Sequence, residues 1–126
     1  NAVKHFAHTR AERGKRRLHR TPNHAEITAC RPWWIAEVEA VRPELLVCLG
    51  AVAAKAVLGP GFRVTRERGT LLDPPAEIAG AVRALLATIH PSAVLRADDR
   101  HTVYAGLRDD LAIAAAEINR ASAGRR

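Results

Sequence analysis

Two short apolar runs, each ended by a residue that stops a strand, constrain the fold of this chain most. LLVCLG at residues 45–50 has five apolar residues before Gly50, which is typical of a short buried strand. AVAAKAVLG follows and predicts a compact helix that Gly59 closes. ALLATIHPS at residues 84–92 is a second apolar run, broken by Pro91. Strands that alternate with helices favour a parallel sheet covered on both faces, so we expect an α/β fold.

Two longer helical patterns flank these runs. Apolar residues recur at spacings of three and four from residue 23 to about residue 41, which predicts one helix with an apolar face. Pro32 lies inside this pattern, and because proline lacks a backbone donor we expect it to kink the helix or split it in two. Residues 103–118 predict a C-terminal helix, and ASAGRR after it a frayed tail. FRVTRERGTLL between the apolar runs predicts a strand or a hairpin.

Most of the positive charge lies at the start of the chain. The net charge is +7 overall, and the first 20 residues hold seven Lys and Arg against one Glu, a net +6. We expect residues 1–22 to form a basic segment that is mostly loop. A basic patch confined to one segment favours a nucleic acid as partner, with a solvated arm as the alternative. Within it, GKRRLHRTP places His19 among four cations.

Composition and motifs exclude several other classes of protein. Hydrophobic residues make up 48% of the chain, enough for one domain with a modest core. The longest apolar runs fall far short of the roughly 20 residues that span a bilayer, and no export signal opens the chain. Two cysteines without a CxxC spacing favour a reducing cytoplasm over a disulfide framework. The enzyme signatures GxxxxGK[ST], GxSxG and HExxH are absent.

Polar residues next to the expected strands are candidates for a site, because chemistry in such sheets gathers at the carboxyl ends of strands. His90 follows the second apolar run and would donate a hydrogen bond to a substrate carbonyl or a developing anion; a histidine satisfied within a loop is the alternative. Asn1 offers a donor and an acceptor to one edge of a base, unless it is a frayed end. Cys30 and Cys48 fall in apolar patterns and suit the core. Trp33 is either a stacking platform for a base or half-buried packing.

Six segments occur in an order that resembles the uracil-DNA glycosylase superfamily: NAVKHF, GKRRLH, TACRPWWIAE, VCLGAVAAKAVLG, FRVTRERGTLL and ATIHPSAVLR. The resemblance is to its iron–sulfur branch, and within it to the UdgX type, because ordinary members of the branch lack the KRRLH loop. It implies a three-layer α/β/α sandwich around a short parallel sheet, with a pocket for a flipped-out uracil. Residues 1–126 would then be the C-terminal portion of a single glycosylase-like domain, incomplete at the N-terminus and short of one strand.

The resemblance also implies roles for individual residues. Asn1 falls on the asparagine that reads the uracil edge, and His90 on the histidine that supports the uracil oxygen as charge develops. Ser92 and Arg96 lie in PSAVLR, which matches the segment that approaches substrate and DNA. His19 falls on the histidine that attacks the sugar carbon and stays attached, so that the DNA is captured covalently. The DNA phosphates would be gripped by Lys15, Arg16, Arg17 and Arg20.

A cofactor and a partner follow from the same resemblance. Cys30 and His5 are too far apart in sequence for a local zinc motif, but they match two ligands of a 4Fe–4S cluster whose other two ligands, both cysteines, lie upstream of Asn1. The expected partner is uracil-containing DNA, single-stranded or with its base flipped out, with no membrane contact, for a monomeric cytoplasmic protein. Two alternatives are a conventional glycosylase that excises uracil hydrolytically and a non-catalytic basic module that only grips DNA.

Overall fold

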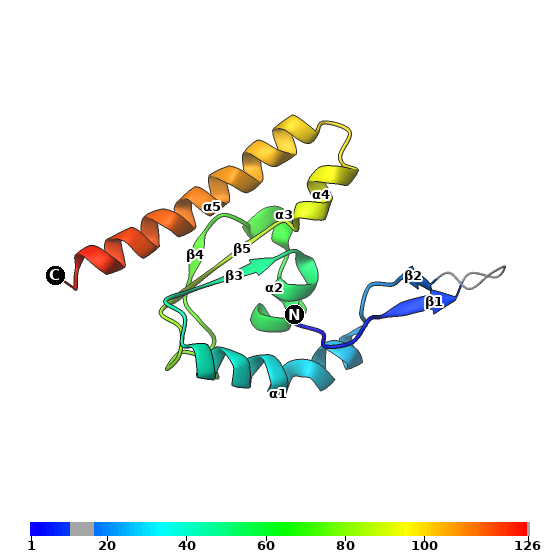
Figure 1. The fold of residues 1–126 in the computed structure, drawn as a ribbon, viewed down its shortest axis with the longest axis horizontal. Helices are drawn as coiled ribbons and strands as arrows, with labels where there is room; N and C mark the ends of the chain where they lie inside the picture. The colour runs from blue at the N-terminus through cyan, green and yellow to red at the C-terminus, as the bar shows by residue number, and fades with distance from the viewer. Residues whose placement is uncertain (11–16, 126) are drawn as a thin grey trace.

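The computed structural model describes residues 1–10 and 17–125, which form two small sheets and five helices (Figure 1). Lys15 and Arg16 lie outside the described residues. In chain order the elements are β1 (His8–Arg10), β2 (Arg17–His19), α1 (His24–Val41), β3 (Leu45–Leu49), α2 (Ala51–Leu58), α3 (Val64–Glu67), β4 (Leu71–Leu72), β5 (Ala84–Thr88), α4 (Pro91–Arg96) and α5 (Arg100–Ala123).

The larger sheet has the strand order β3-β5-β4. β3 and β5 are the two apolar runs of the sequence, and they pair in parallel from Leu45 opposite Ala84 to Leu49 opposite Thr88. β4 pairs with β5 in the antiparallel direction, so the expectation of an all-parallel sheet is wrong for this strand. A parallel pair needs a crossover connection, usually a helix, and residues 73–83 between β4 and β5 contain no helix.

Helices cover both faces of this sheet, which confirms the expected α/β architecture. Figure 1 shows α5 on one side of the strands and α1 with α2 on the other. β5 is the centre of the core, since Leu85, Leu86 and Ala87 are all fully buried. Trp34 of α1 and residues of α2 belong to the same buried cluster. The apolar stripe of α1 and the apolar runs in the strands therefore meet in one core, as binary patterning requires.

The helices follow the sequence pattern with four corrections. The segment FRVTRERGTLL, expected as a strand or a hairpin, contains the short helix α3 before the two-residue strand β4. α1 begins after Asn23 and runs through Pro32 without a break, so a split into two helices is wrong; the helix is buried on either side of the proline, at Cys30 before it and at Trp34 after it. α5 continues to Ala123, so the first half of the expected frayed tail, residues 121–123, is helical. α4 was not anticipated; Pro91 opens it, a position that suits proline. No helix in the described part of the chain is long and apolar enough to cross a bilayer.

Residues 1–22 differ from the expected loop because they include a hairpin. β1 and β2 pair antiparallel, with His8 opposite His19 and Arg10 opposite Arg17. Figure 1 shows this hairpin standing away from the core beside the start of α1. Both strands are largely exposed, so no alternation of buried and exposed side chains marked them in the sequence.

The buried carboxylate of Asp110, a residue of α5, links this helix to the end of β5. Asp110 is 8% exposed and accepts hydrogen bonds from the hydroxyl of Thr88, which is fully buried, and from Nε of Arg68 at 2.8 Å. The adjacent Gly69 donates its backbone N–H to the carbonyl of Ala87 at 2.9 Å. A buried charge is tolerated when it is paired and hydrogen-bonded in this way. The carboxyl end of β5 is thus held from two sides.

We predict that Asp110→Ala lowers the free energy of unfolding by about 1–3 kcal/mol, because it leaves the Thr88 hydroxyl and the Arg68 guanidinium without their acceptor. The neighbouring Asp109 pairs with Arg108 at the exposed surface. Asp109→Ala is therefore the matched control, expected within about 0.5 kcal/mol of the parent. Urea denaturation followed by circular dichroism measures both, and equal effects of the two substitutions would contradict the anchoring role of Asp110.

Candidate functional site

The first part of the site forms where β3 and β5 end side by side. Gly50 follows β3 and donates its backbone N–H to the carbonyl of Thr88 at 2.8 Å. Gly50 has φ of +92°, and a Cβ placed on it would lie 3.0 Å from the Cβ of His90. Only glycine combines this backbone conformation with so close a neighbour. The parallel register therefore brings Gly50 and His90 together at the carboxyl edge of the sheet.

His90 is held in a defined orientation by the helix that follows it. It is the N-cap residue of α4, and its Nδ1 lies 3.0 Å from the backbone N of Ser92 and 2.8 Å from the Ser92 hydroxyl oxygen. A backbone N–H can only donate, so Nδ1 accepts and the proton of the neutral ring resides on Nε2. The ring is exposed, and its Nε2–H is the atom available to a ligand. Ser92 thus contacts His90 directly.

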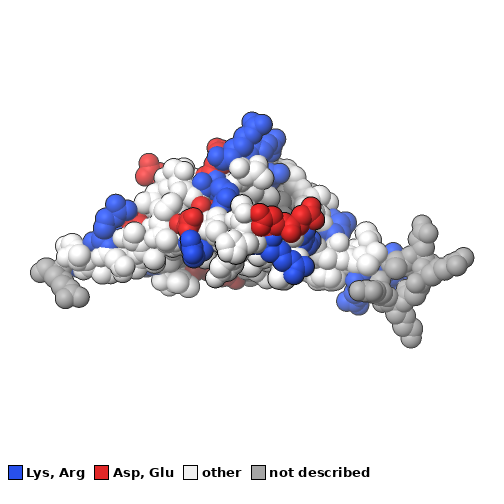
Figure 2. Space-filling view, turned by 90° about the horizontal axis from the view of Figure 1, so that it is seen from above, with Lys and Arg blue, Asp and Glu red and all other residues white. Residues whose placement is uncertain are grey.

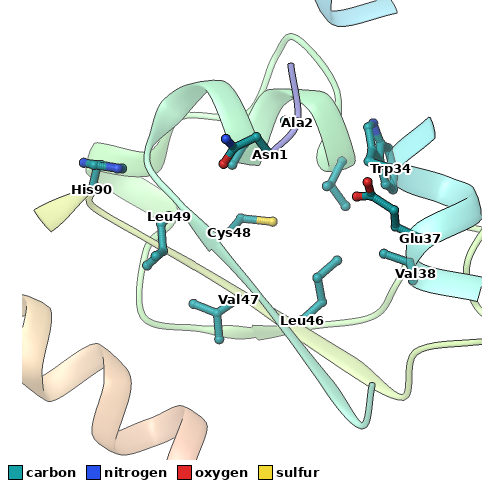
Figure 3. A pocket seen from close by; sticks show the side chains of 12 residues that line it. Asn1, Ala2, Trp34, Glu37, Val38, Leu46, Val47, Cys48, Leu49 and His90 are labelled. Carbon is teal, nitrogen blue, oxygen red and sulfur yellow. The ribbon is translucent and has the colours of Figure 1, made fainter. Parts of the chain in front are cut away.

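A cavity of about 340 Å³ lies beside His90 (Figure 3). Its lining includes both Asn1 and His90, which come from opposite parts of the chain, together with Trp34 and Glu37 of α1 and Cys48 of β3. Burial raises the pKa of the Cys48 thiol from 9.0 to about 11, so this part of the wall is uncharged at pH 7. The buried Nε1 of Trp34 has no hydrogen-bond partner among the described residues. The cavity is thus mostly apolar with a few polar groups, as ligand sites usually are.

The cavity runs along the outer edge of β3. Leu46, Val47, Cys48 and Leu49 all line it, and because successive side chains of a strand point to opposite faces, four consecutive residues can share a wall only along the edge. Among the described strands, β3 pairs with β5 alone. The expectation that a strand is lacking stays a prediction, and this edge, with its backbone groups open to pairing, is where such a strand would fit.

The second part of the site is the hairpin that carries His19. The His19 ring is exposed and lies 5.8 Å from the ring of Phe6, which in turn stacks on His8 at 5.3 Å between centroids. His19 is not among the residues that line the cavity. The structure therefore brings Asn1 and His90 together but leaves His19 on a separate, projecting element. Arg17 is exposed on the same hairpin.

Glu26 in the first turn of α1 connects this hairpin to the helix. Its carboxylate accepts hydrogen bonds from the two terminal guanidinium nitrogens of Arg20, at 3.0 and 2.6 Å, and from the backbone N–H of Asn23 at 2.8 Å. These bonds, that of Arg20 above all, lower the pKa of Glu26 from 4.5 to about 2. The pKa of Glu26 is lower in the folded than in the unfolded state. The ion pair with Arg20 therefore stabilises the fold fully above about pH 4.5, and this stabilisation is lost as the pH falls toward 2.

Cys30 and His5 lie side by side although they are distant in sequence. The Sγ of Cys30 is 3.9 Å from Nδ1 of His5, and the backbone N–H of Lys4 donates to the same sulfur at 3.4 Å. The other ring nitrogen of His5 faces Glu26 at 3.4 Å, which is the carboxylate contact that metal-binding histidines usually have. The two donors therefore fit adjacent ligand positions. No third ligand joins them within residues 1–10 and 17–125.

Outside the basic N-terminal segment, positive and negative side chains are mixed. On the face that Figure 2 shows, Lys and Arg groups lie among Asp and Glu groups over the middle of the molecule. Arg96 is exposed in the last turn of α4, on the helix that His90 opens. Trp33 is 67% exposed on α1, so of the two alternatives for this residue, half-buried packing is wrong.

Sequence reasoning missed several residues that shape the site. Glu26 lies three positions after Asn23, the spacing of a capping box, and that signal was present in the sequence. Phe6 and Gly50 gave no comparable signal, because a ring stack and a close backbone approach depend on segments distant in sequence. Asp110 likewise looked like an ordinary surface residue of an amphipathic helix.

The fold is that of an α/β domain, and its cavity runs along β3 and reaches His90 beyond the carboxyl end of β5, the end of the strands at which open sheets of this class bind their ligands. The chain belongs to the Uracil DNA glycosylase superfamily, whose sequence profile matches residues 1–112. The expectation drawn from the resemblance is confirmed at that level.

Two relatives refine the comparison. The chain is 35% identical over 79 residues to the type-4 uracil-DNA glycosylase of Pyrobaculum aerophilum, and the match covers 61% of this chain and 40% of that protein. It is 33% identical over 78 residues to the type-4 uracil-DNA glycosylase of Thermotoga maritima, with 61% and 38% covered. The chain thus spans about two-fifths of the length of these curated relatives.

We predict that Gly50→Ala destabilises the fold more than Gly59→Ala does. Both glycines have positive φ, +92° and +100°, so alanine strains the backbone at either position, but none of the described residues lies within 4 Å of a Cβ at Gly59. The contact with His90 should add about 1–3 kcal/mol at Gly50 alone. Urea denaturation measures the difference, and the ring signals of His90 in NMR spectra should shift only in Gly50→Ala. Equal destabilisation with unshifted signals would contradict the close approach.

Proposed function

We propose that this chain supplies the base-binding and sugar-reacting part of a uracil-DNA glycosylase. The observation that carries the proposal is that Asn1 and His90 line one cavity, with the Nε2–H of His90 free to donate. An enzyme that acts on a base must take it out of the stack and into such a pocket. The names of the two relatives support uracil in DNA as the substrate.

In the proposed reaction the cavity binds a flipped-out uracil. The Asn1 amide donates to and accepts from the edge of the base. As the glycosidic bond breaks, the electron pair goes to uracil, and the Nε2–H of His90 donates to the oxygen on which negative charge develops. Ser92 acts on the ring of His90, keeping Nδ1 an acceptor and Nε2 a donor. The sugar is left as an oxocarbenium-like cation, as in other glycosidic cleavages.

We further propose that His19 captures this cation. A neutral imidazole nitrogen forms a bond to the sugar carbon, the ring loses its N–H proton to solvent, and the departed uracil anion takes up a proton. The exposed ring of His19 is open to such contact, and correct positioning gives an attached nucleophile a large advantage over water. Because His19 lies outside the cavity, the bound nucleotide has to extend from the cavity to the hairpin.

DNA binding is proposed to rest on the basic hairpin and on α4. Cations that contact phosphates fix the position of the strand without reading its sequence. Arg17 and Arg96 are exposed and suited to this contact, and Lys15 and Arg16 carry the same charge in the segment between the hairpin strands. Arg20 differs, because its guanidinium is already engaged by Glu26.

Cys30 and His5 are proposed to hold one side of a 4Fe–4S cluster. A cysteine sulfur and an imidazole side by side, with a backbone N–H directed at the sulfur, suit such a group. Bound there, the cluster would join the N-terminal residues to α1 through metal–ligand bonds. The remaining two ligands have to come from outside the described residues.

A second candidate function is hydrolytic excision, in which water captures the sugar cation and an abasic site is released. The position of His19 outside the cavity favours this candidate. A module that grips DNA without chemistry is a third outcome of the same experiment. Uracil-containing and plain single-stranded DNA distinguish all three: a denaturant-resistant adduct with uracil only, an alkali-labile site, or equal binding of both strands.

We predict that His19→Ser, in the full-length gene product that contains this chain, abolishes the covalent adduct and leaves hydrolytic excision in its place. Serine removes the imidazole, so water becomes the nucleophile. The matched control is His8→Ser, which removes the histidine opposite His19 in the hairpin and should leave the adduct in place. Denaturing gels with labelled DNA measure both products. An adduct that persists without His19 would show that another residue is the nucleophile.

We predict that Cys30→Ala in the same full-length protein removes the cluster, measured as bound iron and visible absorption. Alanine provides no ligand, so the cluster would keep only His5 and the two ligands from outside the described residues, one ligand too few. Cys48→Ala is the control, because this cysteine lies in β3 on the cavity wall, away from His5, and should leave the iron content unchanged. Iron retained in Cys30→Ala would refute the assignment.

A further inference from the structure

We infer that Glu26 is a positioning residue that sets the place of the His19 hairpin relative to the N-terminal residues and α1. The inference rests on the proposed capture by His19 and adds a residue to it. Three segments of the chain converge on this one carboxylate: the end of the hairpin through Arg20, the start of α1 through Asn23, and the N-terminal residues through His5.

Two hydrogen bonds between Arg20 and Glu26 link the hairpin to α1. Arg20 directly follows His19, and its guanidinium donates to both oxygens of Glu26, at 3.0 and 2.6 Å. Paired parallel bonds of this kind fix orientation as well as distance. The backbone N–H of Arg20 also donates to the carbonyl of Ala7 at 2.9 Å. The residue next to the proposed nucleophile is therefore held at its backbone and at its side chain.

A helix cap alone does not account for these contacts. The capping box needs one oxygen of Glu26 for the N–H of Asn23, and Oε2 fills that role at 2.8 Å. The other oxygen, Oε1, faces Arg20 and His5 instead. Because its guanidinium is bound to Glu26, Arg20 is less available to a DNA phosphate, and it holds the hairpin instead. The carboxylate is only 20% exposed on its side chain, so solvent competes weakly for it.

The contacts of Glu26 would influence whether His19 or water reaches the sugar carbon first. Capture requires the imidazole to lie close to the sugar carbon when the glycosidic bond breaks, whereas water needs no placement. A hairpin released from Glu26 would still carry His19 but at a distribution of distances, and a displacement of about 1 Å can reduce an intramolecular reaction roughly a hundredfold. Loss of Glu26 should therefore change the ratio of products more than the overall rate of uracil excision.

Glu26→Gln tests this in the full-length protein, because glutamine keeps an oxygen for the Asn23 N–H but loses the charge that binds Arg20. We expect the ratio of covalent adduct to hydrolysed abasic site to fall by about tenfold to a hundredfold, with total uracil excision changed much less. Glu39→Gln, an exposed carboxylate on the same helix, is the matched control and should leave the ratio unchanged. Arg20→Ala should give the same fall, and the double variant no further fall.

Hydrogen exchange provides a readout that does not depend on the chemistry. Protection of the Arg20 backbone N–H should drop in Glu26→Gln and stay unchanged in Glu39→Gln, whether or not an adduct forms. A parent protein that forms no adduct would overturn the proposed capture, and the exchange result would still decide the positioning role. Unchanged product ratio and unchanged protection in Glu26→Gln would reduce Glu26 to a helix cap and overturn the inference.

Discussion

The parallel pairing of β3 with β5 is the constraint on which the rest of the structure depends. Its register places Leu49 opposite Thr88, so the residues that follow the two strands, Gly50 and His90, meet at the same edge of the sheet. A shift of β3 by one residue against β5 would turn the buried Cys48 and the other side chains of β3 to the opposite face of the sheet. The core sequence of the strands therefore fixes the position of His90 as firmly as it fixes the core.

Helix α1 joins this sheet edge to the hairpin. Its middle buries Trp34 in the core and lines the cavity, and its first two turns present Glu26 to Arg20 and Cys30 to His5. One helix thus lines the cavity, carries Cys30 beside His5, and contacts Arg20, the residue next to the proposed nucleophile. The distance between the cavity and the hairpin is set largely by this helix, and a bound nucleotide has to span that distance for capture to occur.

Elements with a local signature could be predicted from the sequence. The apolar runs gave β3 and β5, three-and-four spacing gave α1 and α5, and Gly59 marked the end of α2. The hairpin and the direction of β4 could not be predicted. The strands of the hairpin bury little, so no periodicity marks them, and β4 has two residues whose direction depends on the strand they join and on the connection that follows.

The sequence by itself determined the order of motifs that resembles the family, and with it the candidate residues: Asn1 and His90 as candidates for binding a base, His19 among its cations, and Cys30 with His5 as candidate cluster ligands. Tertiary structure alone decided which of these meet. It brought Asn1 and His90 to one cavity, placed Cys30 against His5, and left His19 on a separate hairpin held through Glu26. The physical reason is that residue type and spacing specify hydrogen-bonding capacity and local backbone form, whereas proximity between distant segments arises only when the core packs and fixes them.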